Sequence, residues 1–300
     1  MSSVEQALAS FGAALAANPF KPAPEPEPPK TSAKVVQFPI PFPVDRPPVC
    51  NVIARTSLFA AIKGKDRRLM DKEIVASQDG VEILFSGRQW NQDDHDNFMQ
   101  LVRLAGCRPL GEYIAVPANA ILRALGRGTG KSQHEQLKAD MHRLVSGTVS
   151  INANGINYIG HLVEDAAQDE REPIRKRHWV YRLNPKLVAL FARNQFTLNN
   201  WENRLALGQK DLAKWLQLWI EGNAQQFATS VETIRERCGS RRADLRKFRF
   251  SLRQALADLE AVGIINGWKI DEADNVRIDR TPSGSQAKHI RKKAERKPRR

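Results

Sequence analysis

Two stretches of this chain are the most informative about its fold. They are SQHEQLKADMHRLVSG, from Ser132 to Gly147, and its counterpart SRRADLRKFRFSLRQALADLEAVG, from Ser240 to Gly263. Apolar residues recur at helical spacing in both, so each predicts an amphipathic helix. A shorter helix and a glycine-containing turn precede each one, and alternating apolar residues typical of a hairpin follow. The order helix, turn, helix, hairpin predicts an α+β, helix-rich chain with two winged-helix units (helix-turn-helix plus β-wing) in tandem.

Local signals place the other elements. The first copy is expected to begin with a hairpin within 70–88 around Asp79-Gly80, a helix capped by Asn91 or Asp93, and a strand at 113–116. A helix from Pro117 to Gly126 and the helix opened by a capping box of Ser132 and Glu135 should follow. The copy is expected to end with a wing hairpin over 148–159, a strand at 178–183 and a helix at 185–192. The second copy is expected to contain a helix at 207–220, a helix at 231–238 capped by Ser230, a turn at Gly239-Ser240, the long helix, and a hairpin around 271–275.

These elements set the expected domain boundaries. Residues 1–50 are predicted to be a disordered tail, because the stretch from Pro19 to Pro48 holds eleven of the seventeen prolines. Residues 51–195 are expected to form the first winged-helix domain and residues 196–281 the second. Residues 282–300 are predicted to be a disordered basic tail.

The charge of the chain points to a polyanionic partner. The formal net charge is +14 and the pI is about 10.0. Basic residues cluster from Arg235 to Arg253 and from Lys288 to Arg300, as a phosphate-binding surface requires. Solubility alone is the alternative explanation of the charge. We expect double-stranded DNA as the partner.

The second long helix carries the clearest candidate contacts. Arg242, Arg246, Arg249 and Arg253 recur at spacings of four, three and four, so they form one stripe opposite the Leu/Phe stripe. Guanidinium groups on such a stripe bind phosphates or guanine edges, whereas a merely solvated face usually includes acids. Arg241, before the helix, and Lys269, in the hairpin, complete the expected DNA-binding set.

The first long helix has a mixed outward face. Its candidate DNA contacts are Arg127, Lys131, Gln133, Gln136 and Lys138, since glutamine can bind adenine and lysine can bind phosphate. The same face could equally serve protein contact or dimerisation.

Two apparent chemical motifs fail on inspection. GRGTGKS, from Gly126 to Ser132, resembles a phosphate-binding loop, but Leu125 stands where the pattern requires glycine and a helix is expected where a strand is required. Asp93-Asp94-His95-Asp96 suggests a metal site, but acids in the first turn of a helix are stabilised by its dipole. We expect no metal, no cofactor and no enzymatic activity.

The compartment follows from cysteine use and hydropathy. Cys50, Cys107 and Cys238 form no CxxC pair, and no apolar run is long enough to span a bilayer. The chain is expected to be cytoplasmic and not to bind membranes.

The chain resembles the TrfA-type plasmid replication initiators. The resemblance rests on WNQDDHDNFMQLV (Trp90–Val102), VPANAILRALGRGTGKSQHEQLKADMHRLVSG (Val116–Gly147) and RKFRFSLRQALADL (Arg246–Leu259), and it extends over roughly Asn51 to Arg280. It implies tandem winged helices that bind origin repeats (iterons), open an adjacent A·T-rich segment and bring in the host helicase without hydrolysing ATP.

The resemblance also implies further partners. These are the host initiator, single-stranded A·T-rich DNA, a second copy in a monomer–dimer equilibrium, and the host sliding clamp. The clamp motif of the family matches at Ser57, Leu58 and Phe59 but has Arg55 in place of glutamine, so Leu58 and Phe59 are candidate clamp contacts; the alternative is the first core helix. A winged-helix transcriptional repressor and an ATPase using Lys131 are the rival functions.

Overall fold

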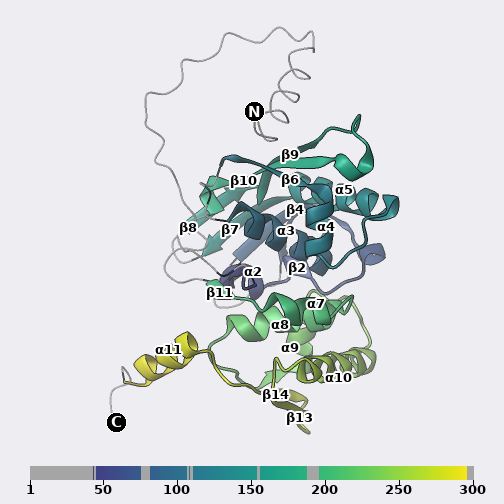
Figure 1. Ribbon diagram of the computed structural model, residues 1–300. Helices are drawn as coiled ribbons and strands as arrows, with labels where there is room; N and C mark the ends of the chain where they lie inside the picture. Colours follow the sequence, from purple (N-terminus) through teal and green to yellow (C-terminus); the bar gives the residue numbers. More distant parts are fainter. Residues whose placement is uncertain are drawn as a thin grey trace.

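The computed structural model describes residue 43 and residues 45–75, 82–106, 108, 111–153, 156–187 and 196–295. The tail expected over 1–50 lies outside these residues up to residue 42, as do the turn at Asp79-Gly80 and the end of the helix expected at 185–192. Figure 1 shows an upper part, built on two sheets, and a lower part, in which helices pack over a small sheet.

Three helices form the centre of the upper part. They are α3 (Gln92–Ala105), α4 (Ala118–Ala124) and α5 (Lys131–Ser146), and α3 packs against both others. Asn91 caps α3 in a capping box with Asp94. Of the two expected caps, Asn91 and Asp93, the structure thus has Asn91. The capping box expected at Ser132 and Glu135 is wrong. The helix α5 begins at Lys131 after Gly130, so Ser132 already lies inside the first turn.

Two antiparallel sheets complete the upper part. The first has the order β3 (Leu69–Val75), β4 (Glu82–Arg88), β7 (Thr148–Ala153), β8 (Ile156–Gly160), and the second has the order β6 (Tyr113–Pro117), β10 (His178–Leu183), β9 (Val163–Gln168). The hairpin expected over 148–159 therefore exists, but as half of a four-stranded sheet. Buried Val149 and Ile151 stand opposite buried Phe85 and Ile83, and this apolar pairing draws the hairpin to β4.

The wing of the first copy is consequently β9–β10, a correction to the sequence prediction. The strand β10 pairs with β6, which directly precedes α4. The loop between β9 and β10 includes the short 3-10 helix η2 (Ile174–Lys176).

The lower part repeats this plan. Its elements are α8 (Asp211–Gly222), β12 (Thr229–Ser230), α9 (Val231–Arg237), α10 (Leu245–Ala261), β13 (Gly267–Ile270) and β14 (Asn275–Asp279). The strand order β12-β14-β13 matches β6-β10-β9 of the upper part. The Ser230 side chain caps α9 as predicted, and Asp244 caps α10. Both parts are thus winged helices with a three-stranded sheet.

Several segments depart from the sequence predictions. The helix expected from Leu207 begins at Asp211, because Gly208 adopts φ 58° and separates it from an unexpected α7 (Trp201–Ala206). Residues of the predicted tails are also ordered. They form β1 (Pro48–Cys50), which pairs with β11 (Phe196–Leu198), and α11 (Gly284–Glu295). The helix α11 projects from the lower part (Figure 1) and is held by Gln286, whose Nε2 donates to the Glu221 carbonyl at 2.7 Å.

Short elements connect these parts. They are α2 (Asn51–Ala54), the parallel pair β2 (Phe59–Ala60) and β5 (Trp90–Asn91), and the 3-10 helices η1 (Gly64–Asp66) and η3 (Pro185–Leu187).

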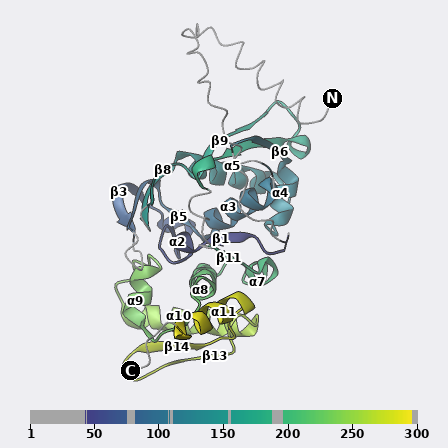
Figure 2. The same cartoon turned by 90° about the vertical axis from the view of Figure 1, so that its left-hand side faces the viewer.

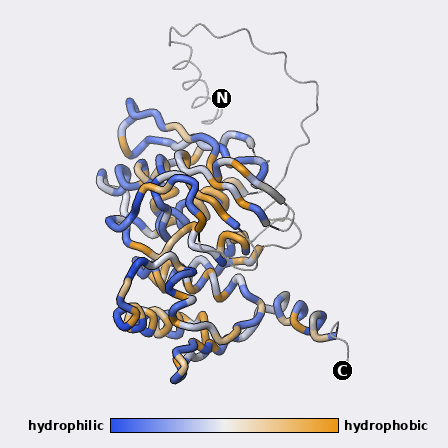
Figure 3. Tube along the Cα trace, turned by 180° about the vertical axis from the view of Figure 1, so that it is seen from behind, coloured by the Kyte–Doolittle hydropathy of each residue, from blue (hydrophilic) through white to orange (hydrophobic). Residues whose placement is uncertain are grey.

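Each part has its own hydrophobic core. One cluster runs from Cys50 to Leu183 and includes Trp90 and Phe98; the other runs from Leu207 to Val276 and includes stacked Trp215 and Trp219. Figure 3 shows apolar segments concentrated inside the upper part. The two clusters agree with a division of the chain near residue 196. The exact boundary between the two domains stays a prediction.

Polar contacts join the two parts. Asp96 on α3 accepts hydrogen bonds from Arg204 Nε on α7 at 2.7 Å and from Lys214 Nζ on α8 at 2.6 Å. Arg204, only 1% exposed, also donates to Gln92 Oε1 at 2.7 Å and to the Lys214 carbonyl at 2.6 Å. The helix α8 lies between α2 and α10 in Figure 2. These three side chains therefore fix the lower part against the upper one.

A glycine brings the helix turn of the lower part against the upper part. Gly239 adopts φ 71°, and a Cβ there would lie 2.9 Å from the Ala60 Cβ and 3.0 Å from the Ser57 Cβ. The Ala61 amide donates to the Cys238 carbonyl at 2.8 Å beside it. A side chain at residue 239 would separate the two parts.

The titration of the buried groups follows from these contacts. Burial works against ionisation of Asp96, but Arg204 and Lys214 outweigh it and lower the pKa of the carboxyl. Burial, with the nearby Arg204 charge, lowers the pKa of the His95 imidazole to about 3. His95 is therefore neutral in the folded protein.

Replacement of Asp96 by asparagine should destabilise the protein strongly. It leaves Arg204 and Lys214 buried without a counter-charge, which costs about 3–5 kcal/mol. The matched change Asp165→Asn removes a half-exposed pair with Arg182 and should cost less than about 1 kcal/mol. Urea unfolding of both variants measures the difference, and equal losses would contradict the role of Asp96.

His95 should make stability depend on pH. The unfolded imidazole, with a pKa of about 6.5, binds a proton that the folded one excludes, so stability falls as the pH decreases below 6.5 towards 3. The contribution is about 2 kcal/mol at pH 5. Urea unfolding of His95→Gln at pH 5 and pH 7.5 should show a smaller pH dependence than the unmodified protein; an unchanged dependence would contradict this account.

Candidate nucleic-acid interface

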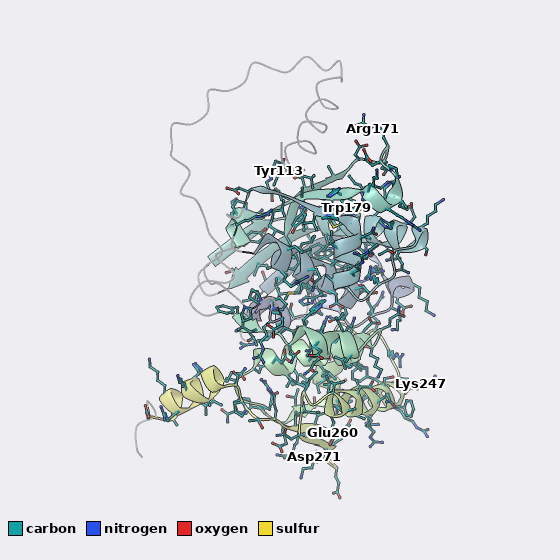
Figure 4. The ribbon with its side chains drawn as sticks, in the orientation of Figure 1. Tyr113, Arg171, Trp179, Lys247, Glu260 and Asp271 are labelled. Carbon is teal, nitrogen blue, oxygen red and sulfur yellow. The ribbon has the colours of Figure 1, made fainter. Side chains whose placement is uncertain are left out.

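The outer face of α10 carries exposed cations. Phe248 and Leu252 face the core, while Arg246, Lys247 and Arg253 are exposed. Among the described residues, neither Arg246 nor Arg253 has a hydrogen-bond or ion-pair partner for its side chain. Figure 4 shows Lys247 at the outer edge of the lower part. The arginine stripe is therefore present on α10 for these residues.

Arg249 differs from its neighbours on the stripe. Its Nε and Nη2 donate to the two carboxylate oxygens of Asp274 at 2.8 Å and 2.6 Å. Asp274 lies in the turn between β13 and β14 with φ 60°. The hydrogen bond from Arg249 lowers the pKa of the Asp274 carboxyl. Arg249 of the predicted stripe therefore pairs with a carboxylate and holds the wing against the helix, and its contact with DNA stays a prediction.

Arg242 also departs from the expected stripe. It precedes α10 instead of lying on it, and its Nη1 donates to the Ser251 Oγ at 2.6 Å. Arg241 beside it is exposed. Both line a cleft of about 760 Å³ between the start of α8 and α10. The predicted stripe begins one turn too early, because Asp244 caps α10 and Arg242 lies before it.

The wing adds two cations next to the helix. Lys269 on β13 and Arg277 on β14 are cross-strand partners and both are exposed. Arg277 Nε donates to Asp271 Oδ2 at 3.2 Å. The backbone hydrogen bond from Asn275 is the main cause of a lowered pKa for Asp271. Lys269 was an expected contact; Arg277 was missed, although its alternation with Val276 and Ile278 could have placed it on the outer face.

The equivalent helix of the upper part is more heavily engaged. Arg127 Nη1 donates to Asp140 Oδ2 at 2.7 Å, and Gln136 Nε2 donates to Asp140 Oδ1 at 2.7 Å. Lys138 pairs with Glu170 in the β9–β10 loop, and this hydrogen bond lowers the pKa of Glu170. Of the five residues expected to contact DNA here, Lys131 is exposed and Gln133 is half-buried.

Asp140 belongs to a buried ionic cluster that ties α5 to α3. Arg143 pairs with both Asp140 and Asp94, and Arg67 Nη2 reaches Asp94 Oδ2 at 2.9 Å. Burial raises the pKa of Asp94 in spite of Arg143 and Arg67. The acids at the start of α3 thus cap the helix and pair with arginines. In the part of the chain that the structure describes, no group of His, Cys, Asp and Glu could hold a metal ion.

The candidate clamp contacts lie in the core, which disfavours them as a surface for a partner. Leu58 is 1% exposed and Phe59 is 2% exposed. Phe59 stacks on Trp90 with ring centroids 5.1 Å apart and packs edge-on against His95. The alternative, a core position, is correct, although Phe59 lies in the short strand β2 instead of a helix.

The GRGTGKS segment follows a helix, as the sequence analysis expected. The helix α4 ends at Ala124, and Gly126 adopts φ 68° in the turn to α5. The strand that a phosphate-binding loop requires is not at this place. Residues 126–130 of the segment form the turn of the first helix-turn-helix, and Lys131 and Ser132 begin α5.

Comparison with known proteins identifies relatives of this chain. Residues 34–280 match the protein family described as TrfA protein. A curated relative, the plasmid replication initiator protein TrfA of Escherichia coli, is 22% identical over 230 residues. That match covers 74% of this chain and 59% of the relative, so it spans less than two thirds of the relative's length.

Solved structures resemble the fold. Domains 2 and 3 of RctB match with a TM-score of 0.51 at 12% identity, covering 79% of this chain and 99% of that one. A selenomethionine form of the same domains matches with a TM-score of 0.53 at 13% identity, covering 81% and 99%. The tandem arrangement of the two parts is therefore a known fold. No helix among the described residues is long and apolar enough to cross a membrane.

Loss of single arginines from α10 should weaken binding to a random-sequence DNA duplex. Each of Arg246→Ala and Arg253→Ala should reduce the slope of log affinity against log salt by about 0.9, the value of one phosphate contact. Fluorescence anisotropy at several salt concentrations measures this. Arg171→Ala, which removes a cation at the opposite end of the molecule (Figure 4), should leave the slope unchanged. Unchanged slopes for both α10 variants would contradict a DNA contact there.

Proposed function

Because the chain belongs to the TrfA family of plasmid replication initiators, we propose that it initiates replication by binding repeated sites (iterons) in double-stranded origin DNA. Binding promotes opening of an adjacent A·T-rich region and brings host replication proteins to it. The binding steps, the repeats and the host partners are part of this proposal.

The observation that carries the proposal is the exposed basic face of α10 beside a basic wing. Arg246 and Arg253 form no direct ion pair among the described residues, although Asp274 is close enough to feel the Arg253 charge, and Lys269 with Arg277 extends the positive surface onto the hairpin. A helix of this kind fits the major groove, where arginine binds guanine edges, while a wing contacts the flanking phosphates.

The two helix-turn-helix units contribute unequally in this proposal. Arg127 and Lys138 of the upper part are held by Asp140 and Glu170, so its remaining contacts are exposed Lys131 and half-buried Gln133, with Gln136 exposed but bound to Asp140. The helix α10 therefore supplies most of the sequence-specific contact, and α5 adds a second contact in a neighbouring groove. Exposed Lys288, Arg291 and Lys292 on α11 supply further phosphate contacts.

Binding free energy, not nucleotide hydrolysis, opens the duplex in this scheme. Copies bound on adjacent repeats strain the DNA, and pyrimidine–purine steps in an A·T-rich region yield first. If six to ten phosphates are neutralised, affinity falls by about 10³–10⁵ between 50 and 200 mM salt. Single-stranded A·T-rich DNA is a further ligand, and a monomer–dimer equilibrium sets how many copies are available.

The host partners of the proposal are the replicative helicase and the host initiator, both by family membership. The sliding clamp is not assigned to Leu58 and Phe59, because both side chains are buried.

The proposal predicts origin opening without a nucleotide. Footprinting on the plasmid that encodes this chain should show protection of direct repeats. Permanganate should then modify thymines in the neighbouring A·T-rich segment of the supercoiled plasmid when no ATP is present. The Lys131→Ala variant should still open the segment, since no ATP site is involved. Any decrease in opening should be no larger than its decrease in DNA affinity.

Other results would change the assignment. Protection of a lone palindrome with no permanganate reactivity would indicate a winged-helix repressor. Opening that requires ATP and fails completely in Lys131→Ala would indicate an ATPase.

A further inference from the structure

One large apolar side chain on α10 is not explained by folding. Phe250 is 74% exposed, whereas Phe248, two positions earlier, is 1% exposed. Two positions correspond to about 200° around a helix, so Phe250 lies on the face opposite the core. A single exposed apolar side chain does not by itself indicate an interaction site, so its surroundings on the helix decide what it could bind.

The neighbours of Phe250 define the chemistry of its partner. Arg246, Lys247, Arg253 and Gln254 are its neighbours three and four positions away on the helix surface, and all four are exposed. Three of the four are cations and none is an acid. Charge complementarity therefore favours a polyanion over an apolar protein surface.

The cleft beside α10 does not account for Phe250. Its walls carry three carboxylates, of which Asp211 pairs with Lys63 at 2.7 Å and Asp258 with Lys210 at 2.9 Å. Phe250 lines the rim of this cleft but remains mostly in solvent. An apolar segment entering the cleft would desolvate these charged pairs, which is unfavourable.

A DNA major groove offers an apolar group among phosphates and polar base edges. Only thymine presents a methyl group there, at carbon 5, and phenylalanine is one of the side chains that contact it. Arginine on either side would bind phosphates or guanine, and Gln254 has the amide that suits adenine. The surface around Phe250 thus matches a mixed sequence that includes thymine.

We propose that Phe250 is a specificity-determining residue that contacts a thymine 5-methyl group in the major groove when α10 binds its DNA site. This inference rests on the proposed function and names a base that the site must contain. The contact is apolar, so it distinguishes thymine from cytosine and from uracil, which lack the methyl group.

The experiment removes one methyl group at a time. A duplex is first selected from a random-sequence library with the full chain, and each thymine is then replaced by deoxyuridine. Replacement of the one contacted thymine should lower the affinity of the unmodified protein about fourfold, which corresponds to the loss of one buried methyl group. Phe250→Ala should bind the thymine duplex about four- to tenfold more weakly and should show no loss on replacement at that position.

A matched control separates this contact from general effects. Phe227→Ala removes another exposed phenylalanine, 66% exposed in the loop before β12, and should keep both the affinity and the deoxyuridine effect. Thermal unfolding of both variants should match that of the unmodified protein, since neither side chain lies in a core.

The outcomes distinguish the two proposals. If Phe250→Ala retains the full deoxyuridine effect, or if no thymine shows one, the thymine contact is wrong while the DNA-binding function stands. If Arg246→Ala and Arg253→Ala also leave duplex affinity unchanged, both the contact and the proposed function are wrong.

Discussion

The arrangement of this molecule depends on one buried carboxylate. Asp96 receives Arg204 and Lys214 from two helices of the other part, and all three side chains are nearly inaccessible to water. Desolvating three charges is costly, and the cost is recovered only where geometry and further hydrogen bonds are good. Such a contact tolerates little sliding, unlike an apolar surface. Together with the apolar cluster of Met99, Trp201 and Leu218, it places α10 relative to α5.

A second constraint repeats in both winged helices. A cation of the second helix pairs with a carboxylate in its wing, Lys138 with Glu170 above and Arg249 with Asp274 below. Each pair holds a hairpin in place beside its helix. The same pairs neutralise one cation on the outer face of each helix, Lys138 on α5 and Arg249 on α10. The lower unit retains Arg246 and Arg253, whereas Arg127 of the upper unit is also paired, and this difference underlies the unequal roles proposed for the two.

The sequence predicted what local patterns control. The helices α4, α5, α9 and α10, the cap at Ser230 and the hairpin β13–β14 all follow from spacing, turns and caps within a few residues. Pairing across long separations was not predictable. The hairpin β7–β8 joins β4 instead of β6, and Arg204 meets Asp96 across 108 positions. The same limit applies to the site, because the spacing that placed Arg249 on the outer face could not show that Asp274 would meet it.

Pairing of Arg249 is compatible with a DNA interface because the pair is weak. Both side chains are about a third exposed, and exposed ion pairs of this kind contribute little to stability. The two non-bridging oxygens of a DNA phosphate offer the same bidentate geometry as the Asp274 carboxylate, so Arg249 can exchange one acceptor for the other at little cost. Away from DNA the carboxylate holds the guanidinium in one orientation and reduces its attraction to other polyanions. Arg246 and Arg253 would make no such exchange, so under the proposed function each contributes the full salt dependence of one phosphate contact.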